Sequence, residues 1–276
     1  MTDIAPAGHT GPVLLSGVPP TTTPVPAAVA TAAAGETVLP VWLNELGGRT
    51  FQLGSGSKRR FAKWSPTGGI DLRPEAAKLR WAAPYVTVPP VLTLVTDDAG
   101  SLLLSEGLPG ENAVTDRWRN DPATAVTAIA VGLRELHDTA PVEHCPFRWS
   151  VADRLRDIDS RAETIDPGRW HDDHRHLTFE QARNLLADPP PIDRLVVCHG
   201  DACAPNTLLT DDGRCSGRVD LGGLGVADRW ADLAIATWST RWNYGPDWER
   251  PLLEAYGVEP DAERTDYYRL LWDLGP

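Results

Sequence analysis

A chain of 276 residues with 42% hydrophobic and 23% charged side chains is long enough to bury a full core, and its composition is that of an ordinary globular protein. Its 38 acidic and 26 basic side chains give a formal net charge of −12, which disfavours nucleic acid as a partner and favours cationic small molecules. The four cysteines form no CxxC pair, and no apolar stretch has the roughly 18 residues of a membrane span, so the sequence predicts a reduced, cytoplasmic protein that does not bind membranes.

The amino-terminal part of the chain is predicted to begin with a flexible lead and to continue as a small sheet. Residues 1–37 are rich in Ala, Thr and Pro, which predicts a flexible segment with at most a short helix. From residue 38 to residue 64, short apolar runs alternate with Gly-rich and basic turns, a pattern typical of antiparallel strands. Residues 73–83 carry Pro74 near their start and strong helix formers after it, so they predict a helix.

A boundary between two lobes is predicted at a Gly/Pro linker. Residues 88–110 contain two apolar runs joined by a DDAG turn, which predicts two more strands, and this segment ends in Gly and Pro at 107–110. We therefore expect an α+β protein in which a small antiparallel sheet lobe, residues 38–108, precedes a mainly helical lobe, residues 109–276.

The second lobe is predicted to be mostly helical. Asp121 is a candidate N-cap before Pro122, and apolar residues recur after it at helical spacing. Residues 151–187 predict further amphipathic helix, interrupted by a DPG turn. The remaining expected elements are a buried strand at 195–197, a hairpin with a DDG turn at 207–223, and two helices at 230–239 and 250–257 that close the chain.

Three polar side chains near the buried strand and the hairpin point to phosphoryl transfer. The segment CHGDACAPN, residues 198–206, places Asp201 just after the strand, where its carboxylate can accept the proton of an attacking hydroxyl. Asn206 can reach a divalent metal beside it, and Asp220 can bridge that metal to nucleotide phosphates. A turn rich in Asp, Asn and Gly is the alternative, but the DxG sequence on the following hairpin favours a kinase-type catalytic core.

The first lobe contains residues that a bound nucleotide would need. The segment ELGGRTFQL, residues 45–53, is a candidate loop that covers the phosphates, although a single glycine pair is a weak signal. Lys63 in a predicted strand can hold the α- and β-phosphates, and Glu75 in the next helix can pair with it. A solvated lysine and glutamate with no common role are the alternative.

These motifs together resemble a known family. The segments HGDACAPN, residues 199–206, and CSGRVDLGGLGVADRWADLAIAT, residues 215–237, resemble the signature of the aminoglycoside O-phosphotransferases, antibiotic kinases that share the protein-kinase-like fold. Weaker similarity, in the same order along the chain, extends the resemblance over residues 38–272; it lies in PEAAKLRWAAPYVTVPPVL, LLLSEGLPG, LHDTAPVEHCPF and the terminal YYRLL.

The resemblance implies a two-lobed α+β fold, with a five-stranded sheet and a helix in the first lobe. It also implies Mg²⁺, with ATP or GTP as the donor, and transfer of the γ-phosphoryl group to the 3'-hydroxyl of a kanamycin- or neomycin-type antibiotic or to the 3''-hydroxyl of streptomycin. Carried over position by position, the implied site residues are Asp201 for catalysis, Asn206 and Asp220 for Mg²⁺, Lys63 and Glu75 for the phosphates, and backbone groups of Ser105 and Gly107 for the nucleotide base.

The chain departs from the family pattern where the acceptor should bind. Kanamycin-type members continue the DxG sequence with Arg, whereas this chain has Gly223. An Arg-Asp pair of those members is replaced by Trp238 and Ser239, and one acid of a terminal pair is replaced by Trp272. The sequence therefore leaves the identity of the acceptor open.

Three acids are nevertheless candidates for holding a cationic antibiotic. Asp172 and Asp173 fall near an acidic family segment that faces the sugar, and Asp273 remains from the terminal acidic pair. Together with Asp201, they predict weak, salt-sensitive binding of kanamycin-type antibiotics, in a pocket narrowed by the nearby tryptophans. A solvated loop is the alternative for the first two acids.

Other functions stay open at this point. A related kinase for a different cationic acceptor, such as a peptide antibiotic or a metabolite, fits the altered acceptor residues, and a nucleotide-binding protein without catalysis fits the nucleotide motifs alone. Two metal sites are weaker alternatives; they would use Cys198, His199 and Cys203, or His171, His174 and His176.

Overall fold

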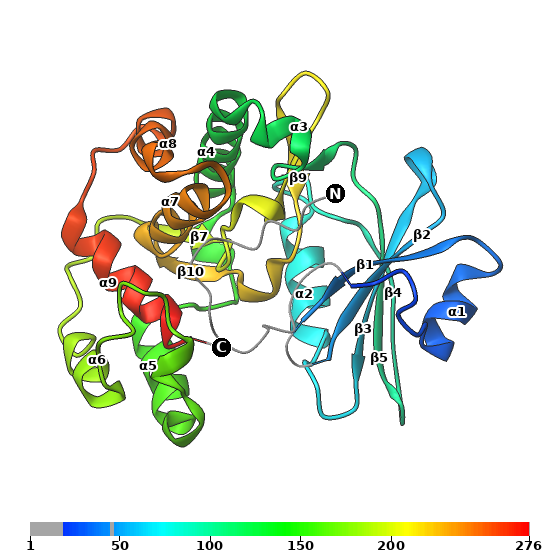
Figure 1. Cartoon of the computed structure of the whole chain (residues 1–276), viewed down its shortest axis with the longest axis horizontal. Coiled ribbons are helices and arrows are strands. Elements are labelled where there is room, and N and C mark those ends of the chain that lie inside the picture. The colour runs from blue at the N-terminus through cyan, green and yellow to red at the C-terminus, as the bar shows by residue number, and fades with distance from the viewer. Residues whose placement is uncertain (1–18, 45–46, 276) are drawn as a thin grey trace. The chain divides into compact units, whose positions relative to one another are not determined.

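The computed structural model describes residues 19–44 and 47–275 and divides the chain into two compact units (Figure 1). Unit 1 comprises residues 1–109 and unit 2 comprises residues 110–276. In the part of unit 1 that the structure describes, an antiparallel sheet is accompanied by two α-helices, whereas unit 2 is mainly helical, so the α+β class predicted from the sequence is confirmed. Within the described residues, no helix is both long enough and apolar enough to cross a membrane.

Unit 1 is a five-stranded antiparallel sheet with a helix on each face (Figure 1). Its strand order is β1-β2-β3-β5-β4. Because neighbouring residues of a strand point to opposite faces, Ala62 packs in the apolar cluster under α1, and Lys63 faces α2. The elements are α1 (Ala27–Ala33), β1 (Val38–Leu43), β2 (Arg49–Leu53), β3 (Arg60–Pro66), α2 (Arg73–Ala82), β4 (Val91–Asp97) and β5 (Gly100–Glu106).

The hairpin between β1 and β2 contains the glycine pair predicted to cover phosphates. Glu45 and Leu46 of this segment lie outside the described residues, as do residues 1–18 of the predicted lead. Gly47 has a φ of 78°, which a side chain would disfavour. The turn is closed by hydrogen bonds from Asn44 N to Gly48 O (2.9 Å) and from Gly48 N to Asn44 Oδ1 (2.7 Å).

Unit 2 packs helices around two small sheets. One sheet pairs β7 with β10, and the other has the order β6-β8-β9. The helices are α3 (Asp116–Arg119), α4 (Pro122–Thr139), α5 (Val151–Ser160), α6 (Phe179–Leu185), α7 (Trp230–Tyr244), α8 (Glu249–Tyr256) and α9 (Ala262–Asp273), and the strands are β6 (Glu111–Asn112), β7 (Leu195–Cys198), β8 (Thr207–Leu209), β9 (Cys215–Arg218) and β10 (Gly225–Asp228).

Helix α4 illustrates how local sequence signals specify an element. The side chain of Asp121 accepts a hydrogen bond from Thr124 N, and Pro122 occupies the first turn, where a missing N–H costs nothing. The apolar stripe predicted from helical spacing is buried, with Ile129 and Leu136 each 1% exposed and Leu133 fully buried. This helix therefore forms part of the core of unit 2.

Two expectations for unit 2 are wrong. The predicted closing helix at 250–257 is followed by a further helix, α9, which begins at the N-cap Asp261. Its first half, AERTD, has no apolar stripe to reveal it, and its second half buries Tyr268 and Leu271. The amphipathic helix expected over residues 151–187 is also interrupted for longer than the DPG turn: no α-helix covers residues 161–178, so Asp172 and Asp173 lie in a loop before α6.

Candidate active site

In unit 1, the structure brings together the two residues predicted to hold nucleotide phosphates. Lys63 lies on β3 and Glu75 in the first turn of α2, and Lys63 Nζ is 2.7 Å from Glu75 Oε2. Their side chains are only 23% and 9% exposed, so the pair is mostly removed from water. An ammonium group held in one position can bind a phosphate group, because the lysine acts as a localised positive charge.

The predicted contacts with the nucleotide base lie at the end of β5. Ser105 is paired in register with Phe61 on β3, and Gly107 N donates to Arg59 O (2.8 Å). A Cβ atom at Gly107 would lie 2.8 Å from Arg59 O, so only glycine permits this approach of the two strands. Because the Gly107 N–H is used within the chain, a contact with a base would have to come from its carbonyl oxygen.

Phe61 is a candidate nucleotide-binding residue that sequence reasoning missed. It lies on the same face of β3 as Lys63, and a Cβ atom on Gly107 would come within 3.1 Å of its ring. An aromatic ring there offers a flat apolar surface beside Ser105 and Gly107. The alternation of side chains along β3 was the signal that could have identified it.

In unit 2, the loop after β7 holds Asp201 and Asn206 together. Asn206 Nδ2 donates to both Asp201 Oδ2 and Asp201 O, each at 3.0 Å. Asp201 Oδ1 is buried and has no hydrogen-bond partner in residues 19–44 and 47–275. One carboxylate oxygen is therefore fixed in place, and the other remains able to accept a proton.

Asp220 follows β9 in a backbone conformation that is unusual for a residue with a side chain. Its φ of 62° and ψ of 55° lie in the left-handed region. Such strain persists only where the surrounding structure imposes it, and it is concentrated at functional sites. The Asp220 side chain is exposed at the turn between β9 and β10.

Backbone contacts bring the Asp201 loop and the Asp220 turn together. Val219 N donates to Asn206 O (3.0 Å), and the His199 ring bonds to Val219 O through Nε2 (3.0 Å). Gly200 approaches Gly223 so closely that a Cβ atom on Gly223 would lie 2.9 Å from the Gly200 carbonyl carbon. Gly223 therefore has a local structural role, because a side chain there would meet the backbone of Gly200.

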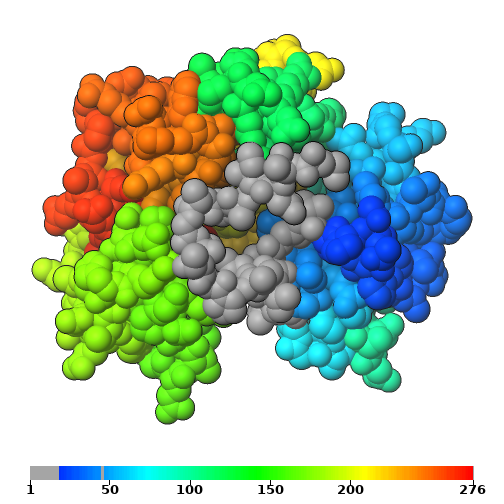
Figure 2. Space-filling model, viewed as in Figure 1, coloured from blue at the N-terminus to red at the C-terminus, as the bar shows by residue number. Residues whose placement is uncertain are grey.

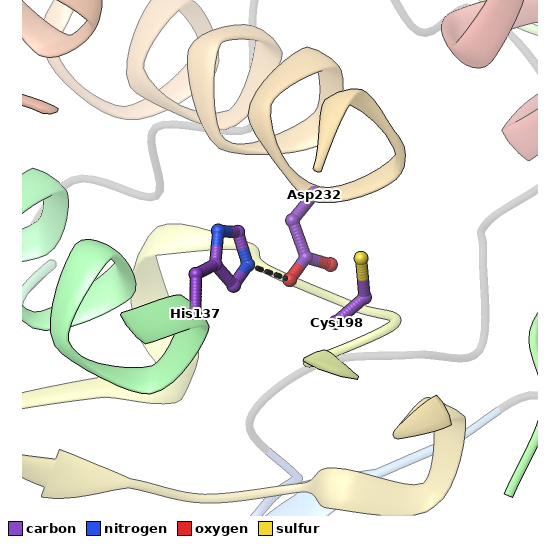
Figure 3. Close-up of side chains that lie close together, drawn as sticks. All are labelled: His137, Cys198 and Asp232. Atoms are coloured by element: carbon purple, nitrogen blue, oxygen red, sulfur yellow. Dashed lines mark hydrogen bonds and ion pairs between the residues drawn. The ribbon is translucent and has the colours of Figure 1, made fainter. Parts of the chain in front are cut away.

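A buried carboxylate, Asp232, holds the start of the Asp201 loop, residues 199–206, which we call the catalytic loop after the role predicted for Asp201 from the sequence. Asp232 Oδ2 accepts from His199 N (2.6 Å), and Asp232 Oδ1 accepts from Gly200 N (2.9 Å). Asp232 Oδ2 is also 3.0 Å from His137 Nε2 (Figure 3). Burial alone would raise the pKa of Asp232, but the hydrogen bonds that it accepts from the His137 ring and from Gly200 N bring the pKa below its usual value, so this carboxylate is ionised.

The tautomer of His137 follows from its two partners. Its Nε2 faces an ionised carboxylate and therefore carries the proton, so Nδ1 accepts from the Tyr256 hydroxyl (2.8 Å). Burial lowers the pKa of His137 and keeps the ring neutral. Sequence reasoning missed both Asp232 and His137, because nothing local links α4, α7 and the loop after β7.

Neither metal site considered from the sequence forms in the described part of the chain. The group whose ligand atoms lie within 4.8 Å of one another is instead His137, Cys198 and Asp232 (Figure 3). Its His and Asp atoms are engaged in the bonds above, and Cys198 Sγ donates to Asp228 O (3.3 Å). Burial raises the pKa of the Cys198 thiol, which disfavours the thiolate that a metal needs. This group is therefore a hydrogen-bonded core network.

The family model of the phosphotransferase enzyme family matches residues 43–268, which include every site residue described so far. The chain belongs to this family. Its curated relatives include an aminoglycoside 3'-phosphotransferase of Streptomyces fradiae, 33% identical over 82% of this chain and 90% of the relative. They also include a streptomycin 3''-kinase of Streptomyces griseus, 36% identical over 83% of this chain and 89% of the relative.

Solved phosphotransferase structures share the fold. An aminoglycoside 3'-phosphotransferase of type VIII superposes with a TM-score of 0.77 at 27% identity, covering 87% of this chain and 94% of that one. An aminoglycoside phosphotransferase of Streptomyces rimosus, in complex with ADP and streptomycin, gives a TM-score of 0.68 at 30% identity, covering 82% and 90%. The family resemblance and the kinase-like fold expected from the sequence are confirmed.

The three acids predicted to hold the acceptor of this phosphotransferase are each close to a basic side chain. Asp273 is 6% exposed and lies 2.5 Å from His174 Nδ1. Asp172 forms an ion pair with Arg175 (2.7 Å), and Asp173 lies 3.3 Å from His171 Nδ1. Asp172 and Asp173 are 60% and 44% exposed, so both can meet a ligand, but their charge is shared with partners in the phosphotransferase itself.

Aromatic rings lie among these acids. We call the set of five rings that connects α7, α9 and the loop before α6 the aromatic cluster; its members are Trp238, Trp242, Trp272, His171 and His174. In Figure 2, the lime-green α5–α6 segment adjoins the red α9 helix of the same unit. Two tryptophans of the cluster, Trp238 and Trp272, contact each other with ring centroids 6.2 Å apart.

Proposed function

We propose that this protein is an aminoglycoside O-phosphotransferase that transfers the γ-phosphoryl group of ATP or GTP to an antibiotic hydroxyl and so confers resistance. The observation that carries this proposal is the pairing of Asp201 with Asn206, which leaves one buried carboxylate oxygen open to a proton. The relatives named for aminoglycoside and streptomycin phosphorylation support the acceptor class. A cytoplasmic location, where ATP and reduced thiols are available, is part of the same proposal.

The proposed reaction assigns one role to each residue of the site. The acceptor oxygen forms a bond to the γ-phosphorus, the bond to the β–γ bridging oxygen breaks, and the nucleoside diphosphate leaves. Asp201 Oδ1 takes the acceptor's proton and orients its hydroxyl. In unit 1, Lys63, held by Glu75, binds the donor phosphates, and backbone groups of Ser105 and Gly107, beside Phe61, contact the base.

The donor set also fits Mg²⁺, which we propose as the cofactor. Mg²⁺ prefers hard oxygen ligands, and Asp220 offers a carboxylate in a strained, exposed turn. Asn206 Nδ2 faces Asp201, so the amide atom that remains for a cation is Oδ1. Bound there, Mg²⁺ would neutralise charge on the transferred phosphate. Asn206 and Asp220 are the residues that would hold it.

A panel assay tests the proposal directly. Purified protein would be incubated with Mg²⁺, ATP or GTP, and streptomycin, kanamycin or neomycin, and the antibiotic product would be analysed by mass spectrometry. We expect a mass increase of one phosphoryl group on at least one antibiotic. Slow nucleotide hydrolysis without any phosphorylated antibiotic would exclude the proposed acceptor class.

Replacing Asp220 by Ala should weaken the binding of Mg-nucleotide by about tenfold or more, because it removes a charged oxygen ligand from a hard cation. Isothermal titration calorimetry with a nonhydrolysable ATP analogue, in the presence and absence of Mg²⁺, measures the effect. Asp212→Ala is a matched control, since Asp212 is an exposed carboxylate in the turn between β8 and β9. Equal Mg-dependent affinity in the two variants would contradict the assignment of Asp220.

The acceptor acids make a separate prediction. Asp172→Asn combined with Asp173→Asn should raise the KM for a polycationic antibiotic a few fold and reduce its dependence on salt, because exposed charge pairs are weak and screened. The KM for ATP should stay unchanged. Steady-state kinetics at low and high ionic strength checks both statements. If the double variant and the parent have the same kinetics for the antibiotic at every ionic strength, the two aspartates are exposed to water and do not bind the acceptor.

A kinase for another cationic small molecule, such as a peptide antibiotic or a metabolite, is the second candidate. Asp172 pairs with Arg175, Asp173 lies 3.9 Å from Arg241, and Asp273 is buried; these contacts favour keeping the second candidate, because less negative charge is then available for a polycation. Nucleotide binding without catalysis gains no support, since the relatives are named as phosphotransferases and kinases.

A further inference from the structure

The aromatic cluster lies close to the catalytic loop within unit 2. Ser239 Oγ accepts a hydrogen bond from Ala204 N (2.8 Å), which fixes the middle of α7 against the segment between Asp201 and Asn206. Trp238 precedes that serine on the helix, and Trp242 lies one turn further along. The cluster is thereby held beside the loop that carries the proposed base.

The cluster has a closed centre and an open edge. Trp238 is fully buried, its ring is 4.4 Å from the His171 ring, and the guanidinium carbon of Arg269 lies 5.4 Å from its centroid. Trp242 and Trp272 surround it at 5.0 and 6.2 Å, with 6.0 Å between their own centroids, and both are partly exposed. The centre is therefore already occupied by packing, whereas the two outer tryptophans remain partly exposed.

The electrostatics of the cluster suit a cation of low charge. Burial lowers the pKa of His171, so its ring is neutral at pH 7, and His174 is paired with Asp273. Two arginines and two acids also lie nearby and offset each other: Arg269 pairs with Glu249 (2.6 Å), and Arg241 lies 3.9 Å from Asp173 and 4.0 Å from Glu249. A polycation would meet little net negative charge here, whereas the face of an indole attracts a single ammonium or guanidinium and packs against an apolar sugar face.

We propose that the partly exposed rings of Trp242 and Trp272 form an acceptor-binding surface and select a sugar that carries a guanidinium or single ammonium group over a polyamine antibiotic. This inference rests on the proposed function and deepens it by naming the residues that decide the acceptor. In this chain, indole rings attract the cationic group of the acceptor, as carboxylates would in an acidic site. Trp238 supports the surface from within the core.

The test compares indole-removing and ring-preserving substitutions. The double variant Trp242→Leu/Trp272→Leu should raise the KM for streptomycin, which carries guanidinium groups, by about tenfold, and the double phenylalanine variant should stay within about threefold of the parent. The KM for ATP and the slow hydrolysis of ATP without acceptor should not change in either. Trp248→Leu, on the segment between α7 and α8 and outside the cluster, is the matched control.

Three results decide the question. Parent-like streptomycin kinetics in a folded leucine variant would overturn the aromatic surface and leave the proposed function intact. A parent that prefers kanamycin to streptomycin would also overturn it, because the surface selects against polyamines. A parent that phosphorylates no aminoglycoside would overturn the proposed function itself. If the double leucine variant does not fold, the single variant Trp242→Leu, at a partly exposed position, decides with the same measurements.

Discussion

Replacing Asp201 by Asn should lower kcat by about a thousandfold while the protein stays folded and still binds nucleotide. Positioned acid–base groups contribute on the order of 10² to 10⁴ to a rate, and an amide cannot accept the proton that Asp201 Oδ1 is placed to receive. The substitution keeps the size of the side chain and its contact with Asn206. Single-turnover measurement of antibiotic phosphorylation, with saturating ATP and acceptor, gives the rate of the chemical step.

The control for this variant is its own binding behaviour. Thermal unfolding and the affinity for Mg-nucleotide should match the parent, so that the loss is confined to the chemical step. A kcat within a few fold of the parent would show that Asp201 is not the base. A loss of nucleotide affinity equal to the loss of rate would instead assign Asp201 to nucleotide binding.

Replacing Asp232 by Ala should have the largest effect on stability, with a loss of about 3–5 kcal/mol in the free energy of unfolding. The buried N–H groups of His199 and Gly200 and the ring of His137 would lose their shared acceptor. Because the folded-state pKa of Asp232 is lowered, its contribution is present above the unfolded pKa of about 4 and disappears as the pH falls through the folded value. Urea unfolding at pH 7 measures the full loss.

Asp228→Ala is the matched comparison for that variant. Asp228 is also buried and accepts from Asp193 N and Trp230 N, so its removal should destabilise the fold as well. Only the Asp232 variant should also reduce kcat in the fraction that remains folded, because only Asp232 holds the backbone at the start of the catalytic loop. Equal kcat values per folded molecule would make Asp232 a purely structural residue.

The sequence allowed the local parts of the site to be predicted better than the parts that depend on distant contacts. Asp201 and Asn206 lie in one short loop, and the hairpin that presents Asp220 has its own turn signal. The order and spacing of these residues, typical of a kinase core, therefore sufficed to predict that they belong to one site. The pairing of Lys63 with Glu75 followed from the order of strand and helix. Such features depend on a few neighbouring residues, which a sequence displays directly.

Other features depend on contacts that no local pattern displays. Helix α9 has a polar first half, and its burial is decided by α7, which it packs against. The contact between Asp273 and His174 joins α9 to the loop before α6 and buries the Asp273 carboxylate, so counting acids overestimated the number of carboxylates exposed to a ligand. Asp232 read as one more residue of an apolar helix, although its carboxylate bonds to three groups from α4 and the catalytic loop.

Helix α7 carries both a residue that holds the catalytic loop, Asp232, and a residue of the aromatic cluster, Trp242. Asp232 lies in its first turn and Trp242 in its last, about 15 Å apart along the axis at roughly 1.5 Å per residue. The turn that holds the start of the catalytic loop is therefore not the turn that carries Trp242. We therefore expect changes at Trp242 to alter which antibiotic is accepted while Asp232 keeps its hydrogen bonds to the backbone of the catalytic loop.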